Sequence, residues 1–234
     1  MTICIIPARS GSKRIKNKNI KKINNVPLLG IVIKIALKSK IFKRIIVSTD
    51  SKKISKLAIK YGAEVPYIRN KKLADDYTTT YEVLVDVVKK LKLKEKYIFC
   101  LYPTAIFTVI KDLKKAFILI KKKNANLVCP VIKLENRVLR SFYIKNNYIK
   151  YIFPKYKLFR SQDLPEVLSD TGSFYIYNTK ALLRINKKNI MPKKTAYYLL
   201  NSKHTIDINY PKDLRLAIKL FKKLKQFLYK SKRH

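Results

Sequence analysis

The sequence predicts an α/β fold, in which helices cover both faces of a mostly parallel sheet and a small β excursion is added. Three observations support this class. Short apolar runs alternate with segments of helical spacing through residues 2–132. The links between them are short, as in sheets whose parallel strands are joined by helices. The later residues instead show a hairpin pattern and further strands. With 234 residues, 47% of them hydrophobic, the chain suits a single domain, 1–234.

The first half contains the alternating elements. Strands are expected at 2–7, 43–49, 63–68, 96–103 and 125–132. Helices are expected at 27–40, 51–62, 78–92 and 109–123, the first opened by Pro27 and the second ended by Gly62. Sheets of this kind bind ligands beyond the carboxyl ends of their strands. We therefore expect a site in the loops after Pro7, Thr49 and Tyr102.

The second half is expected to be richer in β structure. Residues 140–154 predict a hairpin that turns at Asn146-Asn147, a pair that tolerates positive φ. Further strands are expected at 169–178, with Gly172 near the start, and at 204–209. Pro211 opens a C-terminal helix whose apolar residues keep helical spacing, so we expect this helix to pack on the core.

The formal net charge of +40 has two interpretations. A strongly basic chain favours binding to nucleic acid or to another anionic surface. However, 44 of the 54 cationic residues are lysine, they are spread over every segment, and no nucleic-acid-binding motif accompanies them. Asn, Ile and Tyr are also abundant, and the codons of all these residues are rich in A and T. We therefore favour compositional drift and do not expect nucleic acid as a partner.

The cysteines and the apolar runs indicate the location of the protein. Cys4, Cys100 and Cys129 are far apart, and an odd number of cysteines without a CxxC pair argues against a disulfide framework. No apolar run reaches the roughly 18 residues that a membrane span needs. The N-terminus enters an apolar strand at once, without a basic leader. We expect a cytoplasmic protein that makes no membrane contact.

The stretch IIPARSGSKRIKNKNI, residues 5–20, ends the first strand and is rich in cations. A loop that leaves a buried strand can present backbone N–H groups to an anion, and Gly11 allows the backbone to come close. Arg9, Lys13 and Lys18 could then bind several phosphate oxygens together. The stretch is neither a Walker loop nor GxGxxG. The residues alone leave two alternatives open, an anion-binding loop and a surface lysine run.

The same stretch resembles the signature PARxGSKxxxxKN of the CMP-sugar-acid synthetases, which are cytidylyltransferases. Further similar stretches follow in the order of that family at 45–50, 61–80, 100–107, 159–175 and 206–214, so the resemblance covers nearly the whole chain. It implies a Rossmann-like three-layer sandwich of the nucleotide-diphospho-sugar transferase type. It also implies transfer of CMP from CTP to a nine-carbon sugar acid, with release of pyrophosphate.

Three stretches resemble one branch of the family. They are most similar to the corresponding stretches of the enzymes that use pseudaminic acid. The three are Tyr102 before Pro103-Thr104, RSQDL at 160–164 and DTGSFY at 170–175. Sialic acid remains an alternative substrate, and a basic nucleic-acid-binding protein on a degraded fold remains an alternative of another class. The resemblance also implies a homodimer, formed with the excursion at about 136–158, and a role in glycosylation of flagellin or surface polysaccharide.

The resemblance implies roles for individual site residues. Arg9, Lys13 and Lys18 would hold the phosphates and stabilise the leaving pyrophosphate. The nucleotide would be bound by Ala8, Arg9, Gly11, Ser12, Asn19, Thr79 and Thr80, and the sugar acid by Tyr102, Arg160, Gln162 and Gly172. Thr79 and Thr80 could instead cap the following helix, Gly172 could serve only a turn, and Tyr102 could be part of the packing.

The family also requires Mg²⁺, and its metal-binding stretch usually reads Asp-x-Asp before a proline. Here the stretch reads Asp207-Ile208-Asn209. Alternation along the expected strand would place both polar side chains on one face, where they could share an ion. Mg²⁺ takes one or two carboxylates together with substrate phosphates. Either Asp207 suffices, with Asn209 or water completing the shell, or the metal affinity has fallen.

Overall fold

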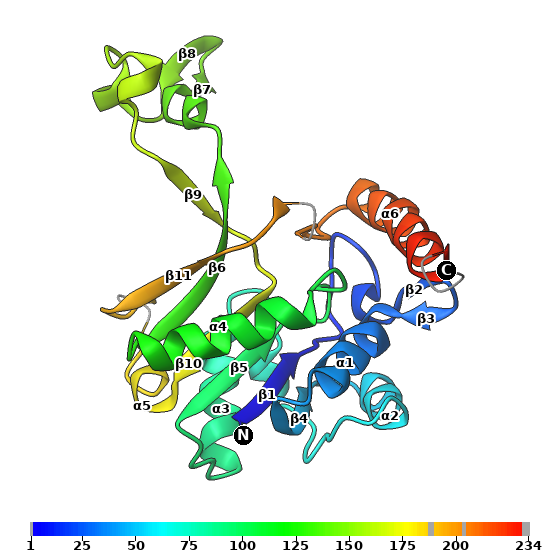
Figure 1. Ribbon diagram of the computed structural model, residues 1–234. Coiled ribbons are helices and arrows are strands. Elements are labelled where there is room, and N and C mark those ends of the chain that lie inside the picture. Colours follow the sequence, from blue (N-terminus) through cyan, green and yellow to red (C-terminus); the bar gives the residue numbers. More distant parts are fainter. Residues whose placement is uncertain (1, 187–189, 203–204, 231–234) are drawn as a thin grey trace.

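The computed structural model describes residues 2–186, 190–202 and 205–230 (Figure 1). Within them the main sheet has seven strands, in the order β4–β1–β5–β10–β6–β11, with β9 attached to β6. The strands are β1 (Thr2–Pro7), β4 (Phe42–Ser48), β5 (Tyr97–Leu101), β6 (Leu127–Leu134), β9 (Val167–Asp170), β10 (Phe174–Asn178) and β11 (Thr195–Leu199). A small separate sheet pairs β2 (Lys22–Ile23) with β3 (Val26–Pro27).

The main sheet is mostly parallel. β1 pairs in parallel with β4 and with β5, and β11 pairs in parallel with β6. β10 lies between β5 and β6 and runs antiparallel to both. β9 is also antiparallel to its neighbour β6. The predicted α/β class is therefore confirmed, with two reversed strands that the apolar pattern did not distinguish.

Helices cover both faces of the sheet. They are α1 (Leu28–Ser39), α2 (Lys52–Lys60), α3 (Thr80–Lys90), α4 (Ile110–Lys122), α5 (Thr179–Leu182) and α6 (Pro211–Lys230). Residues of β1 alternate between two cores: Cys4 and Ile6 pack with α1, α2 and α4, whereas Ile3 and Ile5 pack with α3 and α5. Successive strand residues point to opposite faces, and this division produces the three layers. Short 3₁₀ helices occupy Lys18–Ile20, Lys71–Leu73, Asn136–Arg140, Pro154–Tyr156 and Ser161–Asp163.

An arm, residues 136–163, extends away from the sheet on the ends of β6 and β9 (Figure 1). It contains β7 (Phe142–Lys145) and β8 (Tyr148–Tyr151), which pair antiparallel. Asn146 and Asn147 form the turn between them, with φ of 51° and 62°, a conformation that asparagine adopts more readily than most residues. The hairpin predicted at this pair is therefore confirmed.

Some expected elements differ in the structure. Residues 63–68 form only isolated bridges to the edge of β4. The strand expected at 169–178 is two strands, because Gly172 has a φ of 57° and turns the chain between β9 and β10. Residues 205–209 form no strand, and residue 204 lies outside the described residues. β11 was not expected. It is only five residues long and lies between polar segments, so its apolar pattern is too short to indicate a strand.

The described residues include no helix that is both long and apolar enough to cross a bilayer. Cys4, Cys100 and Cys129 are buried, each within a strand of the main sheet. Their thiols are far from the solvent, and burial raises the pKa of Cys129 to about 12. These cysteines therefore belong to the packing of the sheet.

Candidate active site

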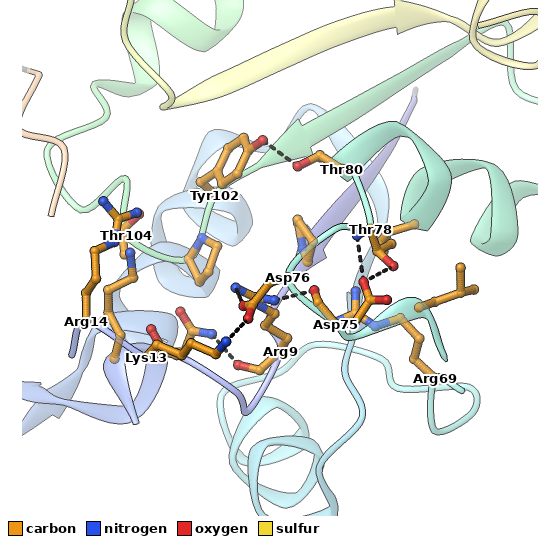
Figure 2. A pocket seen from close by; sticks show the side chains of 17 residues that line it. Arg9, Lys13, Arg14, Arg69, Asp75, Asp76, Thr78, Thr80, Tyr102 and Thr104 are labelled. Carbon is orange, nitrogen blue, oxygen red and sulfur yellow. Dashed lines mark hydrogen bonds and ion pairs between the residues drawn. The ribbon is translucent and has the colours of Figure 1, made fainter. Parts of the chain in front are cut away.

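A cleft of about 520 Å³ opens beyond the carboxyl ends of β1 and β5 (Figure 2). It brings together seven residues that the sequence predicted for the site: Arg9, Ser12, Lys13, Lys18, Asn19, Thr80 and Tyr102. They come from the loop after β1, the first turn of α3 and the end of β5. This is the edge at which open α/β sheets bind their ligands.

The loop after β1 is held in place by hydrogen bonds. Ser10 donates from its backbone N at 2.8 Å and from its Oγ at 2.5 Å to the two carboxylate oxygens of Asp50, which follows β4. Burial raises the pKa of Asp50, but these hydrogen bonds outweigh it and hold that pKa below its usual value. Asn19 is buried and donates from Nδ2 to the backbone oxygen of Arg9 at 2.9 Å. The loop therefore has a defined shape before any ligand binds.

Ala8 and Gly11 contribute through their backbone. Ala8 is fully buried, and its N–H donates to Ser48 O at 2.9 Å, so its side chain does not face the cleft. A Cβ on Gly11 would meet no atom of the described chain within 4 Å. A need for glycine at this position would therefore come only from a ligand that approaches the backbone.

Two aspartates from the segment before α3 contact the cations of the loop. Arg9 forms an ion pair with Asp76 at 2.9 Å and also donates to the backbone oxygen of Asp75. Lys13 pairs with the other carboxylate oxygen of Asp76. The Lys13 ammonium, and with it the Arg9 guanidinium, holds the pKa of Asp76 below its usual range. Asp76 therefore competes for the same cations that we expect to bind phosphate.

Arg69 is a cleft residue that sequence reasoning missed. Its backbone N donates to Thr49 O at 2.8 Å, just after β4, and its side chain lines the cleft. The residue is only 3% exposed, and its Nε has no hydrogen-bond partner among the described residues. Burial lowers the pKa of Arg69, and the Asp50 carboxylate acts in the opposite direction. A buried guanidinium with an unpaired N–H suits an anionic ligand.

Lys18 and Arg14 both contact the segment that precedes α6. Lys18 Nζ donates to Ile208 O at 2.8 Å. Burial lowers the pKa of Lys18, and the carboxylate of Asp207 acts in the opposite direction. Arg14, which we did not select from the sequence, lines the cleft and donates to Asn209 Oδ1 at 3.1 Å. The segment before α6 therefore orients two cations of the cleft.

Asp207 and Asn209 lie side by side, but not for the reason predicted. Residues 205–209 are not in a strand, and the two side chains meet because Asn209 Nδ2 donates to Asp207 Oδ2. Arg14 already donates to the oxygen of Asn209. Within the described chain, no group of three or more His, Cys, Asp or Glu could hold a metal ion. One carboxylate, together with nucleotide phosphates, still fits the ligand preference of Mg²⁺.

Thr79 and Thr80 have different environments at the start of α3. Thr79 forms a capping box, in which Glu82 Oε2 accepts from the backbone N and the Oγ1 of Thr79, at 2.7 Å each. This geometry supports the capping alternative for Thr79, which does not line the cleft. The Oγ1 of Thr80 instead lies 2.6 Å from Tyr102 OH, and both side chains line the cleft (Figure 2).

Arg160 and Gln162 are not brought to the cleft within one chain. Both are exposed on the arm, where Arg160 Nε donates to Asp163 at 2.7 Å. The physical reason is that β6 and β9 carry this segment away from the sheet (Figure 1). Gly172 does not line the cleft either; it lies in the turn between β9 and β10, where a Cβ would be 3.9 Å from Asp207 Oδ2.

The fold and the cleft together define the class of protein. A mostly parallel sheet ends at a cleft lined by Arg9, Lys13, Arg14, Lys18 and Arg69, which is the arrangement of a nucleotidyltransferase. A family model described as cytidylyltransferase matches residues 3–233. The chain belongs to the cytidylyltransferase family.

Similar proteins narrow this description. The pseudaminic acid cytidylyltransferase of Campylobacter jejuni is 34% identical over 224 residues, covering 94% of this chain and 96% of its own. The CMP-N,N'-diacetyllegionaminic acid synthase of Legionella pneumophila is 31% identical and covers 93% and 95%. A bifunctional Helicobacter pylori protein, a pseudaminic acid cytidylyltransferase joined to a hydrolase, is 39% identical over 76% of this chain and 35% of its own.

Solved structures share the fold at low sequence identity. A CMP:2-keto-3-deoxy-manno-octonic acid synthetase complexed with CTP superposes with a TM-score of 0.72 at 15% identity, covering 95% of this chain and 98% of its own. A 4-diphosphocytidyl-2C-methyl-D-erythritol synthase from Anaerococcus prevotii gives 0.66 at 14% identity, covering 94% and 98%. The predicted nucleotide-diphospho-sugar transferase type of fold is thereby confirmed.

Proposed function

We propose that this chain transfers CMP from CTP to pseudaminic acid and releases pyrophosphate. The observation that carries the proposal is the cluster of Arg9, Lys13, Lys18 and Arg69 around a single cleft. Several fixed cations at one site suit a triphosphate, whose charge they stabilise as the bond to pyrophosphate breaks. Relatives named pseudaminic acid cytidylyltransferase, which align with 94% of the chain, support the choice of sugar acid.

The proposed chemistry is a displacement at the α-phosphorus of CTP. The anomeric hydroxyl of the sugar acid loses its proton to solvent water and forms the new P–O bond, while the bond to pyrophosphate breaks. Arg9 and Lys13 hold the leaving phosphates, and Lys18 reaches the α-phosphate. Asn19 contacts the ribose, and Thr80 borders the cytosine. Since little covalent chemistry falls to the protein, the positions of these groups account for most of the catalysis.

We also propose that Asp207 holds Mg²⁺ together with the nucleotide phosphates. The ion would supply charge neutralisation at the phosphates and acidify the attacking hydroxyl. Asn209 would act by orienting its neighbours, since its amide contacts both Asp207 and Arg14. This arrangement uses one carboxylate where two are usual in the family, and the phosphates supply the remaining oxygens.

A homodimer formed through the arm would complete the sugar pocket. The hairpin has an apolar face, on which Ile144 pairs with Ile149 and the two are 77% and 67% exposed. Phe142 lies on the same face and is 47% exposed. A two-stranded hairpin is only marginally stable alone in water, so burial of this face against a second copy is favourable. The arm would then bring Arg160 and Gln162 to a sugar pocket that they do not reach within one chain.

The cellular role is proposed from a further relative. The post-translational flagellin modification protein B of Campylobacter coli is 31% identical over 229 residues. We propose that the present enzyme acts in the cytoplasm and that its product serves glycosylation of flagellin or of a surface polysaccharide. A transferase that accepts CMP-linked sugars must then consume the product.

Pyrophosphate release tests the proposal directly. The purified chain is incubated with CTP and Mg²⁺, with pseudaminic acid and sialic acid in parallel reactions. Turnover of pseudaminic acid alone is the expected result. Turnover of sialic acid alone would keep the family and correct the substrate. No turnover with either acid, in a protein shown to be folded and to bind CTP, would contradict the proposed function.

A further inference from the structure

A row of side chains leads from the cleft to a carboxylate without an assigned role. The hydroxyl groups of Tyr102 and Thr80 are hydrogen-bonded on the nucleotide side. The ring of Tyr102 meets Tyr175 edge to face, with ring centroids 5.9 Å apart. Tyr175 OH in turn donates to Asp170 Oδ2. The row therefore crosses β5 and β10 and ends at Asp170, the last residue of β9.

The carboxylate of Asp170 keeps free capacity to accept hydrogen bonds. Its Oδ1 accepts from the N–H of Gly172 at 2.9 Å, and its Oδ2 accepts from Tyr175. The Cys129 thiol is a third hydrogen-bond partner of this carboxylate. The two oxygens together have about four acceptor positions, so capacity for a further donor remains. The residue is exposed, and no ion pair of Asp170 is found among the described residues. The lack of a cationic partner among the described residues is unexpected in a chain with 54 cationic and 14 acidic residues.

Asp170 lies between the cleft and the arm. It ends the strand that returns from the arm, and it holds the turn at Gly172. A Cβ on Gly172 would lie 3.9 Å from Asp207, the residue that we place at the phosphates. A sugar acid whose anomeric hydroxyl faces the α-phosphate would therefore extend over Tyr102 toward Asp170.

We propose that Asp170 accepts a hydrogen bond from a hydroxyl or amide N–H group of the sugar acid and thereby helps to select it. The inference rests on the proposed function. An ionised carboxylate accepts but does not donate, so it favours a sugar that presents a donor at this point and disfavours one that presents only an acceptor. It also repels the carboxylate of the sugar acid, which directs that group toward the cations. Tyr175 is a positioning residue that orients Asp170.

Asp170→Asn tests the inference with little change in shape. Asparagine keeps an Oδ1 that accepts from Gly172 but replaces the second acceptor with a donor. We expect the KM for the sugar acid to rise about 10- to 100-fold, the effect of losing one charged hydrogen bond, with the KM for CTP unchanged. Tyr175→Phe should give a smaller rise in the same KM. Glu166→Gln is the matched control, because Glu166 is an acid of the same segment that pairs with Lys133 at 2.6 Å, and neither KM should change.

The outcomes separate this inference from the proposed function. If the unmodified enzyme turns over the sugar acid and Asp170→Asn leaves both KM values unchanged, the inference is wrong. A lower KM for the sugar acid would also overturn it, since Asp170 would then act only by repelling an anionic substrate. A rise in both KM values together would indicate a structural role of the turn. Failure of the unmodified enzyme to use any sugar acid would reject the proposed function itself.

Discussion

Arg69→Met should stabilise the protein and weaken CTP binding at the same time. Methionine fills a similar volume without a charge, and Arg69 is 3% exposed with an unpaired Nε. Replacing buried ionic groups by well-packed apolar side chains is often neutral or stabilising by about 1–4 kcal/mol, and a gain in that range corresponds to a melting temperature roughly 2–15 °C higher for a chain of this size. Loss of one charged hydrogen bond to phosphate costs about 1.5–3 kcal/mol, so the Kd for CTP should rise about 10- to 150-fold.

Thermal unfolding without nucleotide and calorimetric titration with CTP and Mg²⁺ measure the two effects. Arg44→Met is the matched control, because Arg44 forms a bidentate pair with Glu64, from Nε to Oε1 at 3.1 Å and from Nη2 to Oε2 at 2.7 Å, on the surface and away from the cleft. The control should not raise the melting temperature and should leave the affinity for CTP unchanged. A less stable Arg69→Met protein with unchanged CTP affinity would refute the reasoning, since Arg69 would then serve the fold rather than the ligand.

Three further predictions concern other parts of the site. Asp76→Asn should lower the KM for CTP, because the carboxylate competes with phosphate for two cations of the loop; a higher KM would mean that Asp76 itself assists binding. Ile144→Asp should shift the proposed dimer toward monomer in sedimentation velocity, whereas Lys150→Gln, on the other face of the hairpin, should not; equal behaviour of the two variants would contradict the proposed interface. Asn209→Asp should tighten Mn²⁺ binding, followed by electron paramagnetic resonance, and lower the Mg²⁺ concentration needed for half-maximal activity. No change in either quantity would show that this position does not matter.

The parallel part of the fold was predictable because local patterns determine it. Apolar runs such as residues 2–7 and 97–101 are buried strands, and the helices between them begin and end near the expected residues. Strand direction and pairing were not predictable in the same way. Nothing in the period of residues 174–178 distinguishes a parallel strand from an antiparallel one. β9 and β10 both run antiparallel to β6, because the chain returns along β6 from the arm instead of crossing over through a helix.

The site was predictable where one continuous stretch forms it. Residues 8–19 are continuous in sequence, and four of their five cations, Arg9, Lys13, Arg14 and Lys18, line one cleft. Asp76 and Asp50 were missed because their contacts with that stretch cross 40 residues or more of sequence, and spacing carries no information at that range. Asp207 and Asn209 were expected together from strand alternation, yet an amide–carboxylate hydrogen bond joins them. The prediction named the right neighbours by an incorrect mechanism.

Arginine marks the cleft more clearly than total charge does. Among the residues that the structure describes, three arginines line it, Arg9, Arg14 and Arg69, and two lysines, Lys13 and Lys18, although lysine outnumbers arginine 44 to 10 in the sequence. If codon composition has replaced arginine by lysine wherever a cation alone suffices, the remaining arginines mark positions that need a planar fork of donors. The bidentate pair of Arg44 with Glu64 agrees with this interpretation. In a chain of this composition, residue type therefore indicates the proposed phosphate site, which the net charge of +40 does not locate.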